Sequence, residues 1–247
     1  MTRPDTASHL HPRVNSYRSR RSTVSSGQQQ TWDRLWPELG MQARSPEGPA
    51  EDLGAPRVRG LLDTQAWFGR SAPVVLEIGS GTGISTLAMA KAEPHIDVVA
   101  VEVYRRGLAQ LLSAIAREGV PNIRLVRGDG VDVLEHMFGP ESLAGVRVFF
   151  PDPWPKARHH KRRLLQPDTI ALIADRLRPG GVLHAATDHA RYAEQIAECG
   201  DAEHRLRRVT ADDGLPISVA RPMTKYETKA RDAGSAVAEL VWEKRPA

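Results

Sequence analysis

Short apolar runs alternate with helix-like segments from about residue 73 onward, and this alternation most constrains the fold. Runs with the length and β-branched content of buried strands occur at 74–78, 98–103, 123–126, 146–150 and 182–186. Helical spacing of apolar residues occurs at 84–92, 105–118, 131–137, 167–177 and 190–199. Two last runs, 204–209 and 236–241, have no clear helix between them. We therefore predict an α/β fold with a doubly wound, seven-stranded, mostly parallel sheet and an antiparallel edge.

The first sixty residues differ in composition from the rest of the chain. Residues 1–30 are rich in Ser, Arg and Gln and hold five arginines against one acid, which predicts disorder. A helical pattern at 28–39 carries Trp32 and Trp36 on one hydrophobic face, and the Pro- and Gly-rich stretch 44–57 has the composition of a linker. We expect a basic, partly disordered, flexible arm and linker over 1–60 and one folded domain over 61–247.

The overall composition restricts the partners and the compartment. The 247-residue chain has a formal net charge of +4 and a pI near 9.4, which favours an anionic partner. Its one cysteine, Cys199, excludes an internal disulfide and fits a reducing compartment, so we expect a cytoplasmic protein. No apolar run of about 18 residues predicts a membrane span, and no apolar segment follows the N-terminal arginines as in a signal peptide. The sequence is compatible with a monomer and with a homodimer.

A glycine-rich turn joins the first strand of this pattern to the first helix. Gly79, Gly81 and Gly83 let the chain turn tightly and approach a ligand closely. Glu77 lies just upstream, where a carboxylate would repel a pyrophosphate but suits a ligand that carries an ammonium and a sulfonium. Dinucleotide binding is the competing interpretation, but its glycine spacing, G-x-G-x-x-G, differs from the G-x-G-x-G found here. The turn resembles that of class I S-adenosylmethionine-dependent methyltransferases.

Two more carboxylates end the next two predicted strands. Glu102 lies where an acid can accept hydrogen bonds from ribose hydroxyls, and Asp129 lies where an acid can meet an adenine amino group. One polar residue at a strand end is weak evidence, because polar residues often end strands. Acids on three consecutive strands, together with the glycine turn, predict a cofactor site formed by Glu77, Gly79, Gly81, Gly83, Glu102 and Asp129.

The segment 149–163 places one carboxylate in a proline-rich turn and follows it with a basic run. Prolines enclose Asp152 and Trp154, end the strand and stiffen the turn. An acid and an aromatic ring on a stiff turn can hold a flat base, and the neighbouring cations can hold its phosphates. The alternative is a proline-rich loop beside a solvated basic face. The predicted RNA contacts are Arg158, His159, His160, Lys161, Arg162 and Arg163; the two histidines lack carboxylate or cysteine partners at ligand spacing, so we expect no metal site.

Joined to the glycine turn, the block Phe-Phe-Pro-Asp-Pro-Trp-Pro-Lys closely resembles the bacterial tRNA (guanine-N7)-methyltransferases. The similarity runs from about Gln28 to Arg245, and it includes Thr187-Asp188 after the fifth strand and Thr-Lys-Tyr-Glu at 224–227. The resemblance implies a Rossmann-like domain, S-adenosyl-L-methionine as cofactor and tRNA as substrate. It also implies methyl transfer to N7 of a guanine in the tRNA variable loop.

The resemblance further implies residue roles. Asp152 matches the family's active-site acid, which also lies at the cofactor. Guanine N7 has a free lone pair and no proton, so its methylation needs no obligate general base, and a nearby carboxylate stabilises the positive charge that develops on the purine. Asp188 is expected to hydrogen-bond the guanine N1/N2 edge. The substrate contacts implied by the resemblance are Lys156, Asp188, Thr224, Lys225, Tyr226 and Glu227.

Two alternative functions share this fold. A class I enzyme that methylates an exocyclic base amino group usually carries Asn/Asp-Pro-Pro-aromatic at the fourth strand, which Pro-Asp-Pro-Trp resembles loosely. A non-catalytic RNA-binding protein is the other alternative. The acids at positions 77, 102, 129 and 152 argue against it, because RNA binding alone does not require them.

Overall fold

A computed structural model describes residues 24–43, 60–222 and 236–246 of the chain. The arginines at the start of the chain, the linker 44–57 and the Thr-Lys-Tyr-Glu motif at 224–227 lie outside the described residues. The expected boundary between arm and domain at residue 60 therefore stays a prediction.

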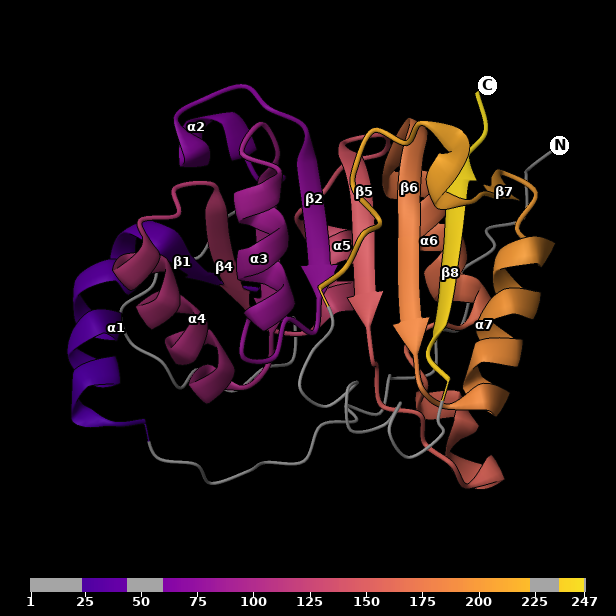
Figure 1. The fold of residues 1–247 in the computed structure, drawn as a ribbon, viewed down its shortest axis with the longest axis horizontal. Helices are drawn as coiled ribbons and strands as arrows, with labels where there is room; N and C mark the ends of the chain where they lie inside the picture. The colour runs from indigo at the N-terminus through magenta and orange to yellow at the C-terminus, as the bar shows by residue number, and fades with distance from the viewer. Residues whose placement is uncertain (1–23, 44–59, 223–235, 247) are drawn as a thin grey trace, which may run out of the picture.

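One mixed sheet forms the centre of the molecule, as Figure 1 shows. In the described chain it has eight strands in the order β1-β4-β3-β2-β5-β6-β8-β7. All neighbouring strands from β1 to β6 are parallel, whereas β8 pairs antiparallel with both β6 and β7. The predicted fold class is confirmed. The strands are β1 (Gly40–Gln42), β2 (Val74–Ile78), β3 (Asp97–Glu102), β4 (Ile123–Arg127), β5 (Leu143–Phe149), β6 (Leu177–Thr187), β7 (Leu206–Arg208) and β8 (Ala238–Lys244).

The sheet differs from the expected seven strands in two places. The additional strand is β1, which pairs with β4 from Gly40↔Leu125 onward. Three residues that begin with glycine are too short for a periodic pattern to reveal. The other difference is β6, which already begins at Leu177. The sequence Pro-Gly-Gly at 179–181 lies between the predicted helix 167–177 and the predicted strand 182–186, but the strand continues through it with a shift of register opposite β5.

Helices cover both faces of the sheet (Figure 1). The apolar faces of α1, α3 and α4 pack on one side, and those of α5, α6 and α7 pack on the other. This arrangement buries both faces of the parallel strands, which explains why those strands are apolar almost throughout. The helices are α1 (Ser26–Leu39), α2 (Thr64–Phe68), α3 (Ile84–Ala92), α4 (Arg105–Glu118), α5 (Gly130–His136), α6 (Pro167–Arg176) and α7 (Ala190–Ala202).

Helix α1 belongs to the packed core. The rings of Trp32 and Trp36 stack with centroids 3.9 Å apart, and both side chains are buried. The guanidinium of Arg105, at the start of α4, lies 4.8 Å from the Trp32 ring centroid. A Cβ atom at Gly40 would lie 2.2 Å from the Trp36 ring, so the turn from α1 into β1 requires glycine. The two tryptophans therefore form the expected hydrophobic face and are closed to a nucleobase.

An irregular segment, residues 214–222, takes the place of a helix over β5 and β6. Ile217 packs so closely on β5 that a Cβ atom at Gly145 would lie 2.4 Å from its Cδ1 atom. Figure 1 shows this segment crossing in front of β5 and descending toward the carboxyl ends of the strands. Its last described residue, Pro222, precedes the first residue of the Thr-Lys-Tyr-Glu motif by two positions in the sequence.

The order of the strands reverses between β2 and β5. From β2 the chain proceeds outward to β3 and β4, and it then returns to β5 and proceeds in the other direction to β6. The loops that follow β2 and β5 therefore leave the sheet in opposite directions. Open parallel sheets bind ligands in the crevice at this reversal, outside the carboxyl ends of the strands.

Candidate functional site at the carboxyl ends of the strands

The glycine turn after β2 has the backbone conformation that its sequence predicts. Gly79, Gly81 and Gly83 have φ angles of +80°, +56° and +78°, a region that other residues rarely adopt. Two of the surrounding contacts also require glycine: a Cβ atom at Gly107 would lie 2.2 Å from the Gly81 carbonyl oxygen, and one at Gly83 would lie 2.5 Å from Leu111. The turn is therefore held directly against α4, with its backbone open to a ligand at Gly79 and Gly81, where an added Cβ would meet nothing.

Glu77 lies almost completely buried beneath this turn, with an exposed fraction of 2%. Its Oε1 atom accepts a hydrogen bond from the Thr86 hydroxyl at 2.9 Å, and its Oε2 atom has no hydrogen-bond partner within the described chain. Burial raises the pKa of Glu77, while the charge of Arg147 and the Thr86 hydrogen bond act in the opposite direction. A buried carboxylate oxygen with no partner is suited to a ligand ammonium group.

Glu102, at the end of β3, clamps the same turn. Its two carboxylate oxygens accept hydrogen bonds from the amides of Gly81 and Tyr104, each at 2.9 Å. Burial raises the pKa of Glu102, the backbone amides of Tyr104, Gly81 and Val103 lower it, and the carboxylate of Asp152 raises it further. The last effect shows that Asp152 lies close enough to Glu102 for their charges to interact, although 50 positions separate them in the sequence.

Asp129 occupies the corresponding place after β4. Its side chain accepts a hydrogen bond from the Val131 amide at 2.8 Å and caps the N-terminus of α5. Gly130 follows because a Cβ atom there would lie 2.3 Å from the Ile78 side chain. The structure thus brings the three predicted acids to the carboxyl ends of three neighbouring strands, β2, β3 and β4.

Asp152 lies exposed on the turn that follows β5. The turn begins where the Phe150 amide donates to the Ala186 carbonyl at 2.8 Å, which ties it to β6. Phe150 and Trp154 have φ angles of +51° and +42°, which are uncommon for aromatic residues and indicate local strain on both sides of Asp152. Such strain persists only where the surrounding structure imposes it.

The basic run after this turn forms a 3₁₀ helix, Ala157–Arg162. Lys156, Arg158 and Lys161 are exposed, as expected for residues that contact phosphates. Arg162 lies over the Trp154 ring at 5.1 Å from its centroid, and the His159 ring meets the edge of Trp154 at 5.7 Å.

The two histidines of this run differ in their surroundings. Loss of hydration, followed by the charges of Arg158, Arg162 and Lys156, lowers the pKa of His159. We therefore expect its ring to be neutral at neutral pH, so that any contact with RNA would use hydrogen bonding or stacking. The Nε2 atom of His160 is buried without a hydrogen-bond partner in the described part of the chain.

Arg163 differs from the residues before it, because only 4% of its surface is exposed. Its guanidinium donates to the Pro153 carbonyl at 2.8 Å and to the Gln195 side chain at 2.5 Å. These contacts point the charge into the protein beneath the Asp152 turn. Its predicted contact with RNA stays untested, but the burial does not favour it.

The predicted guanine contacts fall into two groups. Asp188 is exposed directly after β6, beside the buried Thr187. Asp188 and Asp152 both follow the carboxyl ends of neighbouring parallel strands, because Phe149 of β5 pairs with Ala186 of β6. Thr224, Lys225, Tyr226 and Glu227 lie outside the described residues, so their expected roles stay predictions.

Arg147, the charged residue in the middle of the buried strand β5, is not among the residues predicted from the sequence. Its side chain is fully buried, donates to Glu93 at 2.6 Å and to the Ser218 carbonyl at 3.0 Å, and lies beside Glu77. Glu93 in turn accepts from the Ser218 amide at 2.6 Å. The available signal was the position itself, since a charged residue inside an apolar strand is almost never buried without a partner.

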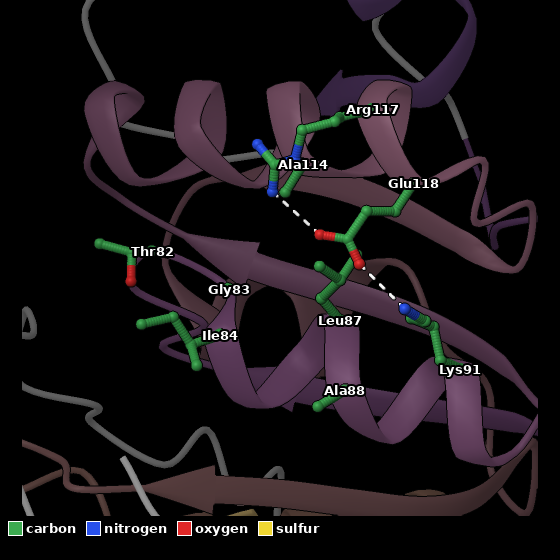
Figure 2. A pocket seen from close by; sticks show the side chains of 9 residues that line it. All are labelled: Thr82, Gly83, Ile84, Leu87, Ala88, Lys91, Ala114, Arg117 and Glu118. Carbon is green, nitrogen blue, oxygen red and sulfur yellow. Dashed lines mark hydrogen bonds and ion pairs between the residues drawn. The ribbon is translucent and has the colours of Figure 1, made fainter. Parts of the chain in front are cut away.

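A surface hollow of about 480 Å³ lies between α3 and α4, as Figure 2 shows. Thr82 and Gly83 of the glycine turn line one end of it. At the other end Glu118 pairs with both Lys91 and Arg117. None of the strand-end acids lines this hollow, so it adjoins the candidate site without forming part of it.

The described residues show neither a metal cluster nor a membrane-spanning helix. These residues contain no cluster of three or more His, Cys, Asp or Glu side chains that could hold a metal ion. They also include no helix that is long and apolar enough to cross a membrane.

Comparison with known proteins gives consistent matches. A family model described as "Putative methyltransferase" matches residues 71–240. A Mycolicibacterium gilvum protein named tRNA (guanine-N(7)-)-methyltransferase is 70% identical, and the alignment covers 98% of this chain and 92% of the relative. A Mycolicibacterium vanbaalenii protein of the same name is 75% identical, with 96% and 88% covered.

A solved structure also resembles this fold. The aminoglycoside resistance methyltransferase NpmB1 has a TM-score of 0.50 and 18% identity, with 76% of this chain and 98% of that chain covered. At this identity the likeness concerns the fold alone. It agrees with the doubly wound sheet and its antiparallel edge.

Proposed function

Because the chain belongs to the tRNA (guanine-N(7)-)-methyltransferase family, we propose that the carboxyl edge of its sheet transfers a methyl group to N7 of a guanine in tRNA, with Asp152 at the reacting atoms. The observation that carries this assignment is the place of Asp152. It is exposed on the turn after β5, next to the glycine turn after β2, and close enough to Glu102 to shift its pKa.

The residues around the glycine turn suit S-adenosylmethionine, which is the methyl donor of this family and supplies an electrophilic methyl group on a sulfonium. Glu77 offers a buried carboxylate oxygen without a partner, as a ligand ammonium requires. Glu102 is fixed by two amide donors at the end of β3, where an acid meets ribose hydroxyls. We assign the amino-acid end of the cofactor to Glu77, its ribose to Glu102, and its adenine side to Asp129.

The chemistry that remains for the protein is positioning and charge. Guanine N7 carries no proton, so the site needs no general base. What it needs is a guanine held in line with the methyl group and a negative charge near the purine, which becomes positive during transfer. Asp152 supplies that charge, and we assign Trp154 to the wall against which the base lies.

Recognition of tRNA is assigned to exposed groups around this turn. Lys156 precedes the 3₁₀ helix that follows the Asp152 turn, and Arg158 and Lys161 lie within it; all three are exposed, so their charges can meet phosphates. Asp188, at the end of the neighbouring strand, is assigned to the N1/N2 edge of guanine, which adenine does not share. Thr224 to Glu227 follow the segment that descends to this edge, and their expected contact with the base belongs to the same proposal.

Methylation of an unmodified tRNA transcript with labelled S-adenosylmethionine, followed by borohydride–aniline cleavage at N7-methylguanine, tests this function. We expect incorporation of label and one cleavage in the variable loop, and loss of both in Asp152→Ala with cofactor binding retained. Incorporation without cleavage would instead indicate methylation of an amino group. Tight tRNA binding without incorporation would indicate a non-catalytic protein. Equal loss of turnover and cofactor binding in Asp152→Ala would contradict the role of Asp152.

A further inference from the structure

The turn that carries Asp152 needs support from outside itself. Residues 151–155 contain three prolines, which have no amide hydrogen to donate, and the turn has no regular secondary structure. Phe150 and Trp154 hold uncommon backbone conformations at its two ends. A turn of this kind keeps one shape only where other groups bind its carbonyls and pack on its side chains.

Arg163 provides such a contact at the residue next to Asp152. Its Nε atom donates a hydrogen bond to the Pro153 carbonyl at 2.8 Å. Because proline has no amide hydrogen, this carbonyl is the only backbone hydrogen-bonding group that Pro153 has. The Pro153–Trp154 peptide, which begins at the residue after Asp152, is therefore fastened directly to a buried guanidinium.

Helix α7 fixes the guanidinium from the other side. The Gln195 side chain accepts a hydrogen bond from Arg163 at 2.5 Å, and the Tyr192 ring lies 4.8 Å from the guanidinium carbon. Tyr192 is itself held, because its hydroxyl accepts a hydrogen bond from the Leu165 amide at 3.0 Å. Arg163 thus joins the Asp152 turn to α7. This helix packs on one face of the sheet, whereas α3, which follows the glycine turn, packs on the other.

The charge of Arg163 has partners suited to this task. Burial raises the pKa of Tyr192 to about 12, so its phenol stays neutral at physiological pH. Within the described residues the guanidinium contacts a carbonyl, a side-chain amide and an aromatic face, and none of these groups is a carboxylate. A planar group with donors in fixed directions can meet all three at once, which an ammonium group cannot.

The preceding residue, Arg162, is placed differently. Its guanidinium lies over the Trp154 ring and its side chain is half-buried. The two consecutive arginines therefore hold the turn at adjacent residues, Arg162 at the Trp154 side chain and Arg163 at the Pro153 backbone. Only the first lies at the surface where a phosphate can approach.

We propose that Arg163 is a positioning residue for methyl transfer: it holds the backbone beside Asp152, and thereby its carboxylate, and it does not contact tRNA phosphates. This proposal rests on the role assigned to Asp152 under the proposed function. A displacement of about 1 Å at a reacting group reduces rates by about 10²-fold, so a support of this kind affects the rate more than binding.

The experiment compares Arg163→Ala and Arg163→Lys with Arg158→Ala and with Arg117→Met, a surface arginine of α4 far from the turn. Single-turnover methyl transfer is measured at saturating tRNA, and tRNA binding is measured over a range of salt concentrations. We expect both Arg163 variants to transfer the methyl group about 10²-fold more slowly with an unchanged salt slope. Arg158→Ala should weaken binding and reduce the salt slope by about one. Arg117→Met should change neither quantity.

Two further measurements separate positioning from misfolding. Binding of S-adenosylhomocysteine and the melting temperature show whether each variant is folded. In Arg163→Ala the removed side chain leaves a buried space, so millimolar guanidinium ion should restore part of the rate. It should restore nothing in Asp152→Asn, which keeps Arg163. Both results are specific to a lost guanidinium contact and would not follow from general instability.

Three outcomes would overturn the proposal. The first is a folded Arg163→Ala that transfers the methyl group at the normal rate while Asp152→Asn is slow. The second is a smaller salt slope with a normal rate, which would place Arg163 on a phosphate. The third is a slow, folded Arg163→Ala that guanidinium does not restore. A normal rate in Asp152→Asn would instead refute the assigned role of Asp152, and a wild-type chain without transfer would refute the proposed function.

Discussion

Arg147 on β5 and Glu77 on β2 are paired in register on neighbouring parallel strands, so that a buried guanidinium lies beside the buried carboxylate assigned to the cofactor. Burial raises the pKa of Glu77, and the charge of Arg147 lowers it. The same guanidinium donates to Glu93 and to the Ser218 carbonyl. One side chain thus connects the cofactor acid, the end of α3 and the segment that leads to the Thr-Lys-Tyr-Glu motif.

The first prediction concerns the stability of this network. Arg147→Met leaves Glu93 buried with no opposite charge, since only 4% of Glu93 is exposed. Breaking a buried ion pair in this way costs about 3–5 kcal/mol of unfolding free energy. Lys91→Met, which breaks the surface pair with Glu118, should cost at most about 1 kcal/mol. Urea unfolding of both variants measures the difference, and equal losses would contradict it.

A matched substitution can show that the loss comes from the unpaired charge. In the double variant Arg147→Met with Glu93→Gln, no charge of this pair remains buried. We expect its stability to exceed that of Arg147→Met alone, since removing both partners of a buried pair is much less costly than removing one. A double variant that is less stable than either single variant would show that packing, and not charge, accounts for the effect.

The second prediction concerns cofactor affinity. Glu77→Gln keeps the size of the side chain but removes the negative charge beside the ligand ammonium. The loss of one charge-assisted hydrogen bond corresponds to an affinity about 10- to 100-fold weaker. Calorimetric titration with S-adenosylhomocysteine measures this change, and Glu118→Gln at the neighbouring hollow is the control that should bind normally. Normal affinity in Glu77→Gln would remove Glu77 from the site.

Much of the fold follows from local sequence. The bounds of α3 and α4 agree with the prediction to the residue, because a positive-φ glycine at position 83 begins the first helix and another at position 119 ends the second. The strand β1 and the first residues of β6 were missed. In both cases pairing with a neighbouring strand, β4 or β5, overrides a local sequence that contains glycine or proline.

The site could be predicted where topology alone decides it. Acids at the ends of β3 and β4 must reach the same end of a parallel sheet, so the shared location of Glu102 and Asp129 could be predicted from their positions, while their roles stay predictions. The surroundings of Arg147 could not be predicted, because its partners lie 54 and 71 positions away. Arg163 was grouped with the exposed cations because it ends a basic run. The carbonyl of Pro153, ten positions earlier, turns it inward.

The third prediction concerns pH. The pKa of Glu77 is raised above its ordinary value of 4.5, and the charged group that faces it from β5 is Arg147, with the Thr86 hydroxyl facing it from α3. An acid with a raised pKa takes up its proton at a higher pH than in the unfolded chain. Cofactor binding, which needs the ionised form, should therefore weaken as the pH falls through this raised value and be complete above it.

Titration of S-adenosylhomocysteine at a series of pH values measures this dependence, because its ammonium group stays charged throughout. The folded chain loses stability as Glu77 ionises with rising pH, and a bound ammonium offsets this loss. The increase in melting temperature caused by the ligand should therefore grow with pH over the same range. In Glu77→Gln this growth should disappear, and an identical profile in both proteins would assign the titration to another group.

The fourth prediction concerns the contact between α4 and the glycine turn. A Cβ atom at Gly107 would lie 2.2 Å from the Gly81 carbonyl oxygen and 3.0 Å from its carbonyl carbon, and backbone atoms cannot move aside without shifting the turn. Gly107→Ala should therefore displace the Gly81 amide from Glu102 and weaken binding of S-adenosylhomocysteine by about tenfold or more.

Gly119→Ala is the control for this substitution. Its φ of +64° makes alanine unfavourable by about 1–2 kcal/mol, but no atom lies near the added Cβ. Calorimetry and urea unfolding should show lost affinity in the first variant and lost stability alone in the second; equal affinities would mean that the turn tolerates the shift.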